Sequence, residues 1–141
     1  MYTLTYLFNG EPAASFSMDQ DYDVKTIGTM PSCSYILENN PEIQPIHLLL
    51  RFTKKHYEVC AVAPCILENK HLVIENWTPI LENQLCYLSP NTIVAITKGS
   101  LDASIQEKMQ IFFLEDFSLT PTPGATTSTP SDPNDSPFIG L

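Results

Sequence analysis

The sequence predicts an all-β protein, an antiparallel β-sandwich of about 10–11 short strands. Apolar runs recur at intervals of roughly 8 to 12 residues, a spacing typical of sandwiches and barrels rather than of helices. Turn-forming residues separate these runs, as in the stretches NGEP, TMPS and ENNPE. No window of sufficient length shows the apolar period of an amphipathic helix, and no internal repeat is present.

The first four strands are expected within the first quarter of the chain. Tyr2–Phe8 largely alternates polar and apolar side chains, and the turn NGEP after it predicts a return strand over Ala13–Ser17. Short runs with β-branched or aromatic residues predict strands over Val24–Gly28 and Ser34–Leu37, because DQDYD, TMPS and ENNPE bound them as turns.

The clearest hairpin is the stretch HLLLRFTKKHYEVCAV. It predicts strands over Ile46–Phe52 and Tyr57–Ala61, joined by a turn at Thr53–Lys55. Similar short runs predict the remaining strands, which are Cys65–Leu67, Leu72–Ile74, Gln84–Tyr87, Thr92–Thr97 and Met109–Glu115. Between the last two strands, Ser100–Lys108 is expected to form one helical turn.

The composition changes abruptly after residue 119. Residues 1–119 are expected to form the sandwich, whereas residues 120–141 are rich in Pro, Thr, Ser and Asp. A segment with so little to bury cannot offset its ordering entropy, so the sequence predicts a flexible tail. Its last residues, SPFIGL, are apolar again. They are either a short docking peptide, with Phe138, Ile139 and Leu141 contacting a partner, or a frayed chain end.

The chain is acidic and poor in charged residues. Its net charge is −9 with seven scattered Lys and Arg residues, which argues against direct nucleic-acid binding because phosphate contacts need clustered cations. Charged residues make up 16% of the chain and hydrophobic residues 43%. A small domain of this composition is expected to present apolar surface to a partner, either another protein or a larger protein assembly.

No targeting or membrane segment is evident in the sequence. The N-terminal stretch MYTLTYLFNGEPAASFSMDQ has no basic leader, and no run reaches the roughly 20 apolar residues of a membrane span. We therefore expect a cytoplasmic or nuclear protein without a membrane span. In those compartments Cys33, Cys60, Cys65 and Cys86 are expected to be reduced thiols.

Familiar catalytic and cofactor motifs are missing from the sequence. It contains neither a G-x-S-x-G element nor a glycine-rich phosphate loop, so we expect no enzymatic activity and no cofactor. The possible zinc ligands His56, Cys60, Cys65 and His71 are separated by three, four and five residues, a spacing that matches no compact zinc site. A small metal-binding β protein stays open as one alternative.

Taken in order, the central strands resemble a known family. The stretch VKTIGTMPSCSYILENNPEIQPIHLLLRFTKKHYEVCAV resembles the central part of a forkhead-associated (FHA) domain, a SMAD/FHA-type sandwich. Ile27 and Gly28 match its Ile-Gly-Arg turn, Ile43 and His47 match its Ile-Ser-Arg-x-His element, and Tyr57 matches its hairpin aromatic. NQLCYLSPNTIVAI and KMQIFFLED are similar to the closing strands, so the resemblance spans residues 2–117. It implies structural roles for Gly28 and His47.

The departures from the FHA pattern bear on function. FHA domains bind phosphothreonine peptides through the Arg of the first element, the Ser of the second and a later Asn-Gly pair. Here the corresponding positions are Thr29 and Gln44, the following Arg is Pro45, and VAPCILENK contains no Asn-Gly. Because a phosphate needs charge-assisted donors, the resemblance implies a degenerate scaffold whose phosphate binding is weak or lost.

Two readings of this scaffold follow. The first is a non-enzymatic protein–protein interaction module, a regulatory factor or a subunit of a larger assembly, which binds without phosphate through Thr29, Met30, Gln44 and Pro45. The alternative is a phosphothreonine-peptide reader with a rearranged pocket. In that case Lys25 or Arg51 would replace the missing donors.

Overall fold

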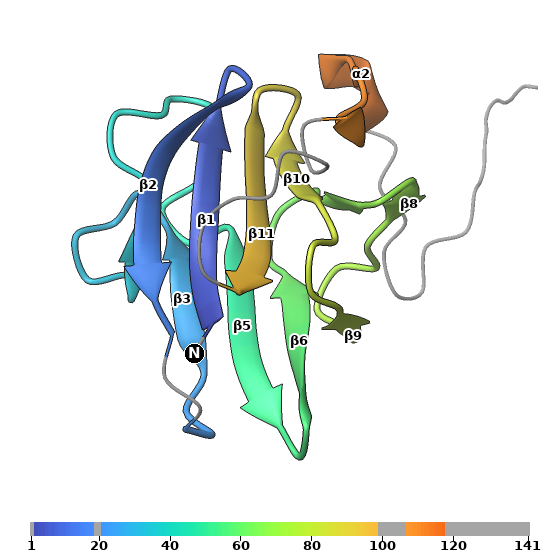
Figure 1. Cartoon of the computed structure of the whole chain (residues 1–141). Coiled ribbons are helices and arrows are strands. Elements are labelled where there is room, and N and C mark those ends of the chain that lie inside the picture. Colours follow the sequence, from blue (N-terminus) through green and yellow to red (C-terminus); the bar gives the residue numbers. More distant parts are fainter. Residues whose placement is uncertain (1, 19–20, 99–106, 118–141) are drawn as a thin grey trace, which may run out of the picture.

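The computed structural model of the protein describes residues 2–18, 21–98 and 107–117. Two β-sheets pack face to face (Figure 1). The larger has the order β2-β1-β11-β10-β7-β8 and contains β1 (Tyr2–Phe8), β2 (Glu11–Ser17), β7 (Ile66–Leu67), β8 (Lys70–His71), β10 (Cys86–Ser89) and β11 (Thr92–Lys98). The smaller has the order β4-β3-β5-β6-β9 and contains β3 (Lys25–Gly28), β4 (Tyr35–Ile36), β5 (Leu48–Thr53), β6 (His56–Ala61) and β9 (Trp77–Ile80).

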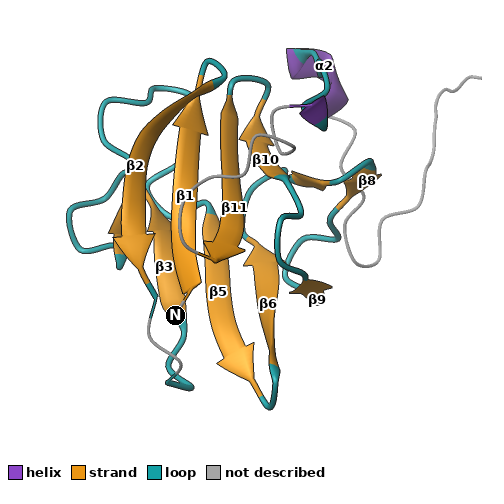
Figure 2. Ribbon diagram, in the orientation of Figure 1, coloured by secondary structure: helices purple, strands orange, loops and turns teal. Residues whose placement is uncertain are grey.

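The predicted all-β sandwich is confirmed. The strand pairs are antiparallel except β3 and β4, which pair in parallel through Ile27 with Tyr35 and Gly28 with Ile36. A short helix, α2 (Leu114–Phe117), follows the strands in the described part of the chain. The strands form most of the ordered architecture (Figure 2).

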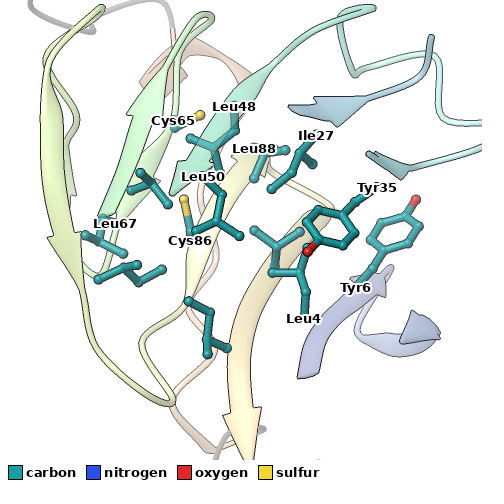
Figure 3. Packing of buried hydrophobic residues seen from close by; sticks show 14 of the residues in the cluster. Leu4, Tyr6, Ile27, Tyr35, Leu48, Leu50, Cys65, Leu67, Cys86 and Leu88 are labelled. Atoms are coloured by element: carbon teal, nitrogen blue, oxygen red, sulfur yellow. The ribbon is translucent and has the colours of Figure 1, made fainter. Parts of the chain in front are cut away.

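The main core lies between the two sheets. In β5, Leu48 and Leu50 are at most 1% exposed, whereas Leu49 between them is half-buried on the outer face. This alternation follows from the pleat, which sends successive side chains to opposite faces of a strand. Figure 3 shows the two inward leucines with Leu4 and Leu88 of the larger sheet. Full burial of each such leucine stabilises the fold by roughly 1.5–3 kcal/mol.

A second apolar cluster covers the outer face of the larger sheet. It consists of Leu7, Ile66, Leu85, Tyr87, Ile93, Ala95 and Phe117, with Met109 and Phe112 packed against it. The Tyr87 hydroxyl donates to the carbonyl of Gln110 at 3.1 Å and accepts from its N–H at 2.6 Å. The Tyr87 and Phe112 rings meet edge to face at 4.8 Å. Strand β11 is therefore buried on both faces, which explains its continuous apolar sequence.

The sandwich has two distinct ends. At one, here called the loop end, the β1–β2 turn, the β3–β4, β4–β5 and β6–β7 loops and the β10–β11 turn come together (Figure 2). At the other, here called the opposite end, lie the β5–β6 turn, the start of β1 and the end of β11. The β1–β2 turn uses Asn9 and Gly10, both with positive φ, as two-residue hairpin turns require.

Around β8 and β9, one predicted strand was wrong and one strand was missed. The strand expected over Leu72–Ile74 lies earlier, at Lys70–His71, where it forms a tight hairpin with β7. Ile74 makes only a single bridge, to Ala61. Strand β9, which the sequence analysis did not predict, contains Pro79, a residue that lacks a backbone donor. Proline is tolerated there because β9 is an edge strand, paired on one side with β6.

The strand predicted over Met109–Glu115 is also wrong. Met109–Phe113 has no regular secondary structure and Leu114–Phe117 is helical, so the segment similar to a last FHA strand is not one. Both edges of β11 are already taken by β1 and β10, so this segment cannot pair with the strand that precedes it. It covers the sheet with side chains instead. Most of the predicted helical turn, and the predicted domain boundary at residue 119, lie outside the described residues.

Candidate functional site

Gly28 ends β3 where the β4–β5 loop crosses the strand. A Cβ atom on Gly28 would lie 2.1 Å from the carbonyl oxygen of Pro45, so no side chain fits there. Beside it, the backbone N–H of Thr29 donates to the carbonyl of Gln44 at 3.2 Å, and that of Met30 donates to Pro45 at 3.1 Å. The bare backbone of Gly28 thus brings together the loops that carry the four residues predicted to contact a partner.

His47 connects three segments of the loop end and is only 3% exposed. Its Nδ1 atom accepts from the backbone N–H of Gln44 at 3.1 Å, and its Nε2 atom lies 3.1 Å from the carbonyl of Pro64. Its backbone N–H donates to Ile27 at 2.8 Å, and its carbonyl accepts from Val62 at 3.0 Å. The β3 end, the β4–β5 loop and the β6–β7 loop are therefore fixed to one residue.

These contacts define the charge state of His47. Because Nδ1 accepts a hydrogen bond, the proton of the neutral ring is on Nε2, which donates to the Pro64 carbonyl. Burial lowers the pKa of His47, against the opposing effect of the Pro64 and Leu88 carbonyls. The imidazole is thus a neutral, enclosed group and presents no positive charge to a ligand.

A buried amide fixes the other side of the β4–β5 loop. Asn40 is 4% exposed, and its Nδ2 atom donates to the Tyr6 hydroxyl at 3.0 Å and to Thr92 Oγ1 at 2.7 Å. Its Oδ1 atom accepts from the backbone N–H of Glu42 at 3.2 Å. The buried, structural role of Asn40 could not be predicted from the sequence. The stretch ENNPE indicates only a turn, and the partners of Asn40 are distant in the chain.

The surface formed by the β3–β4, β4–β5 and β6–β7 connections carries no basic side chain. Gln44 and Pro45 are exposed, while Thr29 and Met30 are half-buried. None of the seven Lys and Arg residues of the chain occurs in residues 29–47 or 62–65, which form the β3–β4, β4–β5 and β6–β7 connections. A doubly charged phosphate would find only backbone and neutral side-chain donors there.

The two cations considered as substitutes for the missing donors lie elsewhere. Lys25 begins β3, at the opposite end from Gly28, and pairs with Asp21 at 3.2 Å. Arg51 lies on the outer face of the smaller sheet, where it pairs with Glu58 at 2.8 Å and stacks 3.9 Å above the Trp77 ring. The Arg51 hydrogen bond is the main cause of the lowered pKa of Glu58.

An apolar groove of about 350 Å³ opens beside the loops. Its lining comes from the β4–β5 and β6–β7 loops, the end of β10 and helix α2, and includes Gln44, His47, Pro64, Leu88 and Phe117. Leu114 in its lining is 70% exposed, and Val62 and Phe113, next to the lining residues Ala63 and Leu114 in the chain, are exposed as well. Sequence reasoning missed this groove, because the segment around α2 was expected to be a strand.

The possible metal ligands and thiols do not form a reactive cluster. Among residues 2–18, 21–98 and 107–117, no three His, Cys, Asp or Glu side chains are arranged to hold a metal ion. All four cysteines are free and buried. Burial raises the pKa of Cys60 and raises that of Cys65 well above its usual range, which disfavours the nucleophilic thiolate.

The remaining predicted contacts, Phe138, Ile139 and Leu141, lie outside the described residues. Within those residues, no helix has both the length and the apolar character needed to cross a bilayer.

Comparison with known proteins links this architecture to one fold. No protein-family model and no curated protein sequence matches the chain. Among solved structures, it is similar to the FHA domain of the CT664 protein from Chlamydia trachomatis, with a TM-score of 0.59 and 17% identity over 70% of this chain and 98% of that one. The N-terminal FHA domain of S. cerevisiae Rad53p, solved in complex with a phosphothreonine peptide, gives a TM-score of 0.57 and 10% identity over 76% of this chain and 99% of that one.

A plant structure agrees with these two. The FHA domain of an Arabidopsis thaliana hypothetical protein gives a TM-score of 0.54 and 13% identity over 72% of this chain and 89% of that one. The protein is therefore a β-sandwich of the FHA fold, which confirms the resemblance seen in the sequence. Its low identity to these structures agrees with a degenerate version of that fold.

Proposed function

We propose that the protein is a non-enzymatic protein–protein interaction module. On this proposal, its loop end binds another protein, or a subunit of a larger protein assembly, without requiring phosphate on that partner. The contact surface would include Thr29, Met30, Gln44 and Pro45. The rigid attachment of both loops to Gly28 and His47 supports this, because a preorganised surface loses little conformational freedom on binding.

The observation that carries the proposal is the absence of Lys and Arg from residues 29–47 and 62–65. A phosphorylated threonine brings about −1.5 to −2 charges, and its desolvation is offset in proteins by charge-assisted donors. The nearby carboxylates of Glu38 and Glu42 add repulsion. An unphosphorylated partner meets neither problem and can use the exposed apolar and amide groups of the loops.

The competing reading as a phosphothreonine reader requires a cation to reach the loops. Lys25 and Arg51 would have to leave Asp21 and Glu58, and Arg51 would have to leave the ring of Trp77 as well. These rearrangements oppose that reading. The expected location in the cytoplasm or nucleus, and a role as regulatory factor or assembly subunit, stay predictions.

The first test separates phosphate-dependent from phosphate-independent binding. Isotope-labelled full-length protein is titrated with a pool of phosphothreonine peptides and with the same pool unphosphorylated, and the amide resonances are followed by NMR. We expect the two pools to leave the amides of Thr29 and Gln44 in the same state. Shifts that cluster there only when phosphate is present would contradict the proposal and assign a phosphopeptide reader.

A second test asks whether the loop end is the contact surface. Partners captured on the wild-type chain are compared with those captured on Met30→Asp, which adds a carboxylate to the proposed surface. Asn76→Asp, which adds the same charge at an exposed position between β8 and β9, is the matched control. Loss of a partner with Met30→Asp alone supports the surface, and equal capture by both variants contradicts it.

A further inference from the structure

The basic residues of this acidic chain gather away from the loop end. All seven Lys and Arg residues are among the described residues. Five of them lie at the opposite end of the sandwich, namely Lys25, Lys54, Lys55, Lys98 and Lys108. Four acidic residues described at this end, Asp21, Asp23, Glu82 and Glu107, leave a local balance of 5 − 4, or one positive charge, in a chain whose net charge is −9. The opposite end is thus a local positive region.

Of these five lysines, Lys25 alone forms an ion pair within the described residues, whereas Lys98 and Lys108 make other contacts and Lys54 and Lys55 are exposed. Lys25 pairs with Asp21, Lys108 donates to the carbonyl of Asn83 at 3.2 Å, and Lys98 lies 5.7 Å from the centre of the Tyr2 ring. By contrast, the turn residues Lys54 and Lys55 are exposed and form no ion pair within the described part of the chain. They are available to an acidic group.

A small pocket of about 190 Å³ lies next to this turn. Its wall is of mixed polarity: Lys55, His56 and Glu82 line it together with the apolar and aromatic residues Tyr2, Phe52, Tyr57, Ile80, Leu81 and Ile96. Pockets for small-molecule ligands usually enclose roughly 300–1,000 Å³. This pocket is therefore too small for a cofactor and has the size of a site for one apolar side chain.

Two exposed apolar or aromatic side chains lie at or beside this pocket, namely Leu81 in its wall and Tyr22 on Phe52. Leu81 is 60% exposed. Tyr22 is 70% exposed and stacks on Phe52 with 6.0 Å between ring centres. Phe52 in turn meets Tyr57 edge to face at 4.9 Å. Aromatic and aliphatic surface next to unpaired lysines suits a segment that combines an apolar anchor with carboxylates.

We propose that residues 132–141 of the same chain dock on this surface. The segment reads DPNDSPFIGL and joins two carboxylates to an apolar end, and no Lys or Arg follows Lys108 in the sequence. The Phe138 side chain enters the pocket, Ile139 covers Leu81, and Asp135 faces the Lys54–Lys55 turn. This placement removes apolar surface from water on both sides of the contact.

The length of the intervening chain allows this contact. Twenty residues, 118–137, separate Phe117 from Phe138. A random-coil chain of that length has a root-mean-square span of about 25 Å. The seven-residue strand β11, which runs between the two ends, is about 23 Å long. A tether matched to the span gives an effective concentration in the millimolar range, so a weak contact is sufficient.

Charge distinguishes this site from the groove beside α2. That groove is lined by Glu42, and helix α2 carries Glu115 and Asp116. An acidic segment is repelled there and attracted at the opposite end. The intrachain contact would leave the loop end open for the partner, so this proposal and the proposed function can fail separately.

The test compares amide spectra of the isotope-labelled full-length chain with those of a Phe138→Ser, Ile139→Ser double variant. We expect chemical-shift changes at Phe52, His56 and Leu81 and none at Gln44 or His47. Thr126→Ser, a change in the same tail outside the docking segment, is the matched control and should leave those amides unchanged. The proposal would be overturned if the amide shifts of the pocket residues were unchanged in the double variant. Shift changes at Ala63 and Leu114 instead would overturn it as well.

Two further measurements address charge and connectivity. Lys54→Glu with Lys55→Glu should shift the same pocket amides toward the positions seen in the double variant. Raising the salt concentration to about 1 M, where the Debye length is about 3 Å, should do likewise. If the pocket amide shifts respond neither to the lysine substitutions nor to salt, the proposed attraction between the tail carboxylates and the lysines is wrong. Shifts that grow with protein concentration would place the tail on a second copy and overturn docking within one chain.

Discussion

The Nδ1 atom of His47 accepts a hydrogen bond from the backbone N–H of Gln44 at 3.1 Å. This contact exists only while the ring is neutral, because a protonated imidazole carries hydrogen on both nitrogen atoms. Protonation would turn an acceptor into a donor that faces another donor, inside a site that is nearly closed to water. The loop end is therefore sensitive to the protonation of one residue.

A pH dependence of stability follows from this contact. Burial lowers the pKa of His47, so between the ordinary histidine pKa of about 6.5 and the lower folded value the unfolded chain binds a proton that the folded chain does not. We expect the free energy of unfolding, measured with urea, to fall as the pH is lowered through this window. Above about pH 6.5 the residue contributes no pH dependence.

The His47→Gln variant isolates this effect, because its side chain does not titrate while all other groups are retained. The stability of the wild type relative to the variant should decrease between about pH 7.5 and about pH 5.5. Parallel pH profiles for the two proteins would show that His47 does not carry the dependence.

Gly28→Ala should destabilise the protein. The added methyl group would meet the Pro45 carbonyl oxygen at 2.1 Å, and both partners are backbone, so a loop must move. Overpacking of this kind typically costs about 1–3 kcal/mol, measurable as a lower urea midpoint. The control is Gly10→Asn, since Gly10 has φ +82° and a Cβ added there would have no neighbour within 4 Å, and asparagine tolerates positive φ. Equal midpoints for the two variants would contradict the tight approach.

Local patterns were sufficient for elements whose neighbours are close in sequence. The bounds of β1 follow from its apolar pattern and the turn after it, and the β5–β6 hairpin follows from two β-rich runs around a short turn. The proximity of Thr29 and Gln44 could be expected only through the FHA pattern, because fifteen positions separate them. No local periodicity in the sequence indicates that two residues so far apart in the chain lie side by side.

Features that depend on distant contacts could not be predicted. Asn40 is buried by Tyr6 and Thr92, which lie 34 and 52 positions away. The run Ile111–Leu114 is as apolar as a strand, but β11 is already paired on both sides, with β1 and β10, and cannot take it as a neighbour. The groove beside α2 was missed for the same reason, since its lining comes from separate segments between Glu42 and Phe117.

Phe112→Ala tests whether the C-terminal segment stabilises the larger sheet. Phe112 is half-buried against Tyr87 at 4.8 Å and Phe117 at 6.4 Å between ring centres, so its loss should cost about 1–3 kcal/mol. The neighbouring residue provides the control, because Phe113 is 64% exposed and Phe113→Ala should change stability by less than about 0.5 kcal/mol. Similar unfolding midpoints for both variants would argue against the packing of this segment.

Placing the FHA donor residues at positions 29 and 44 should create phosphate recognition. In a Thr29→Arg, Gln44→Ser double variant, the guanidinium and hydroxyl groups would occupy adjacent loops that the Thr29–Gln44 backbone hydrogen bond holds together. A hydrogen bond to a charged group contributes about 1.5–3 kcal/mol, so one new contact should raise the affinity for phosphothreonine peptides at least about tenfold. Fluorescence anisotropy with phosphorylated and unphosphorylated peptide pools measures the gain, which should weaken with added salt. Thr29→Gln with Gln44→Ser supplies a long side chain without charge and should show no gain. If the wild type binds the phosphorylated pool as tightly as the Arg variant, then the loops already contain a phosphate site and phosphate-independent binding is the wrong function.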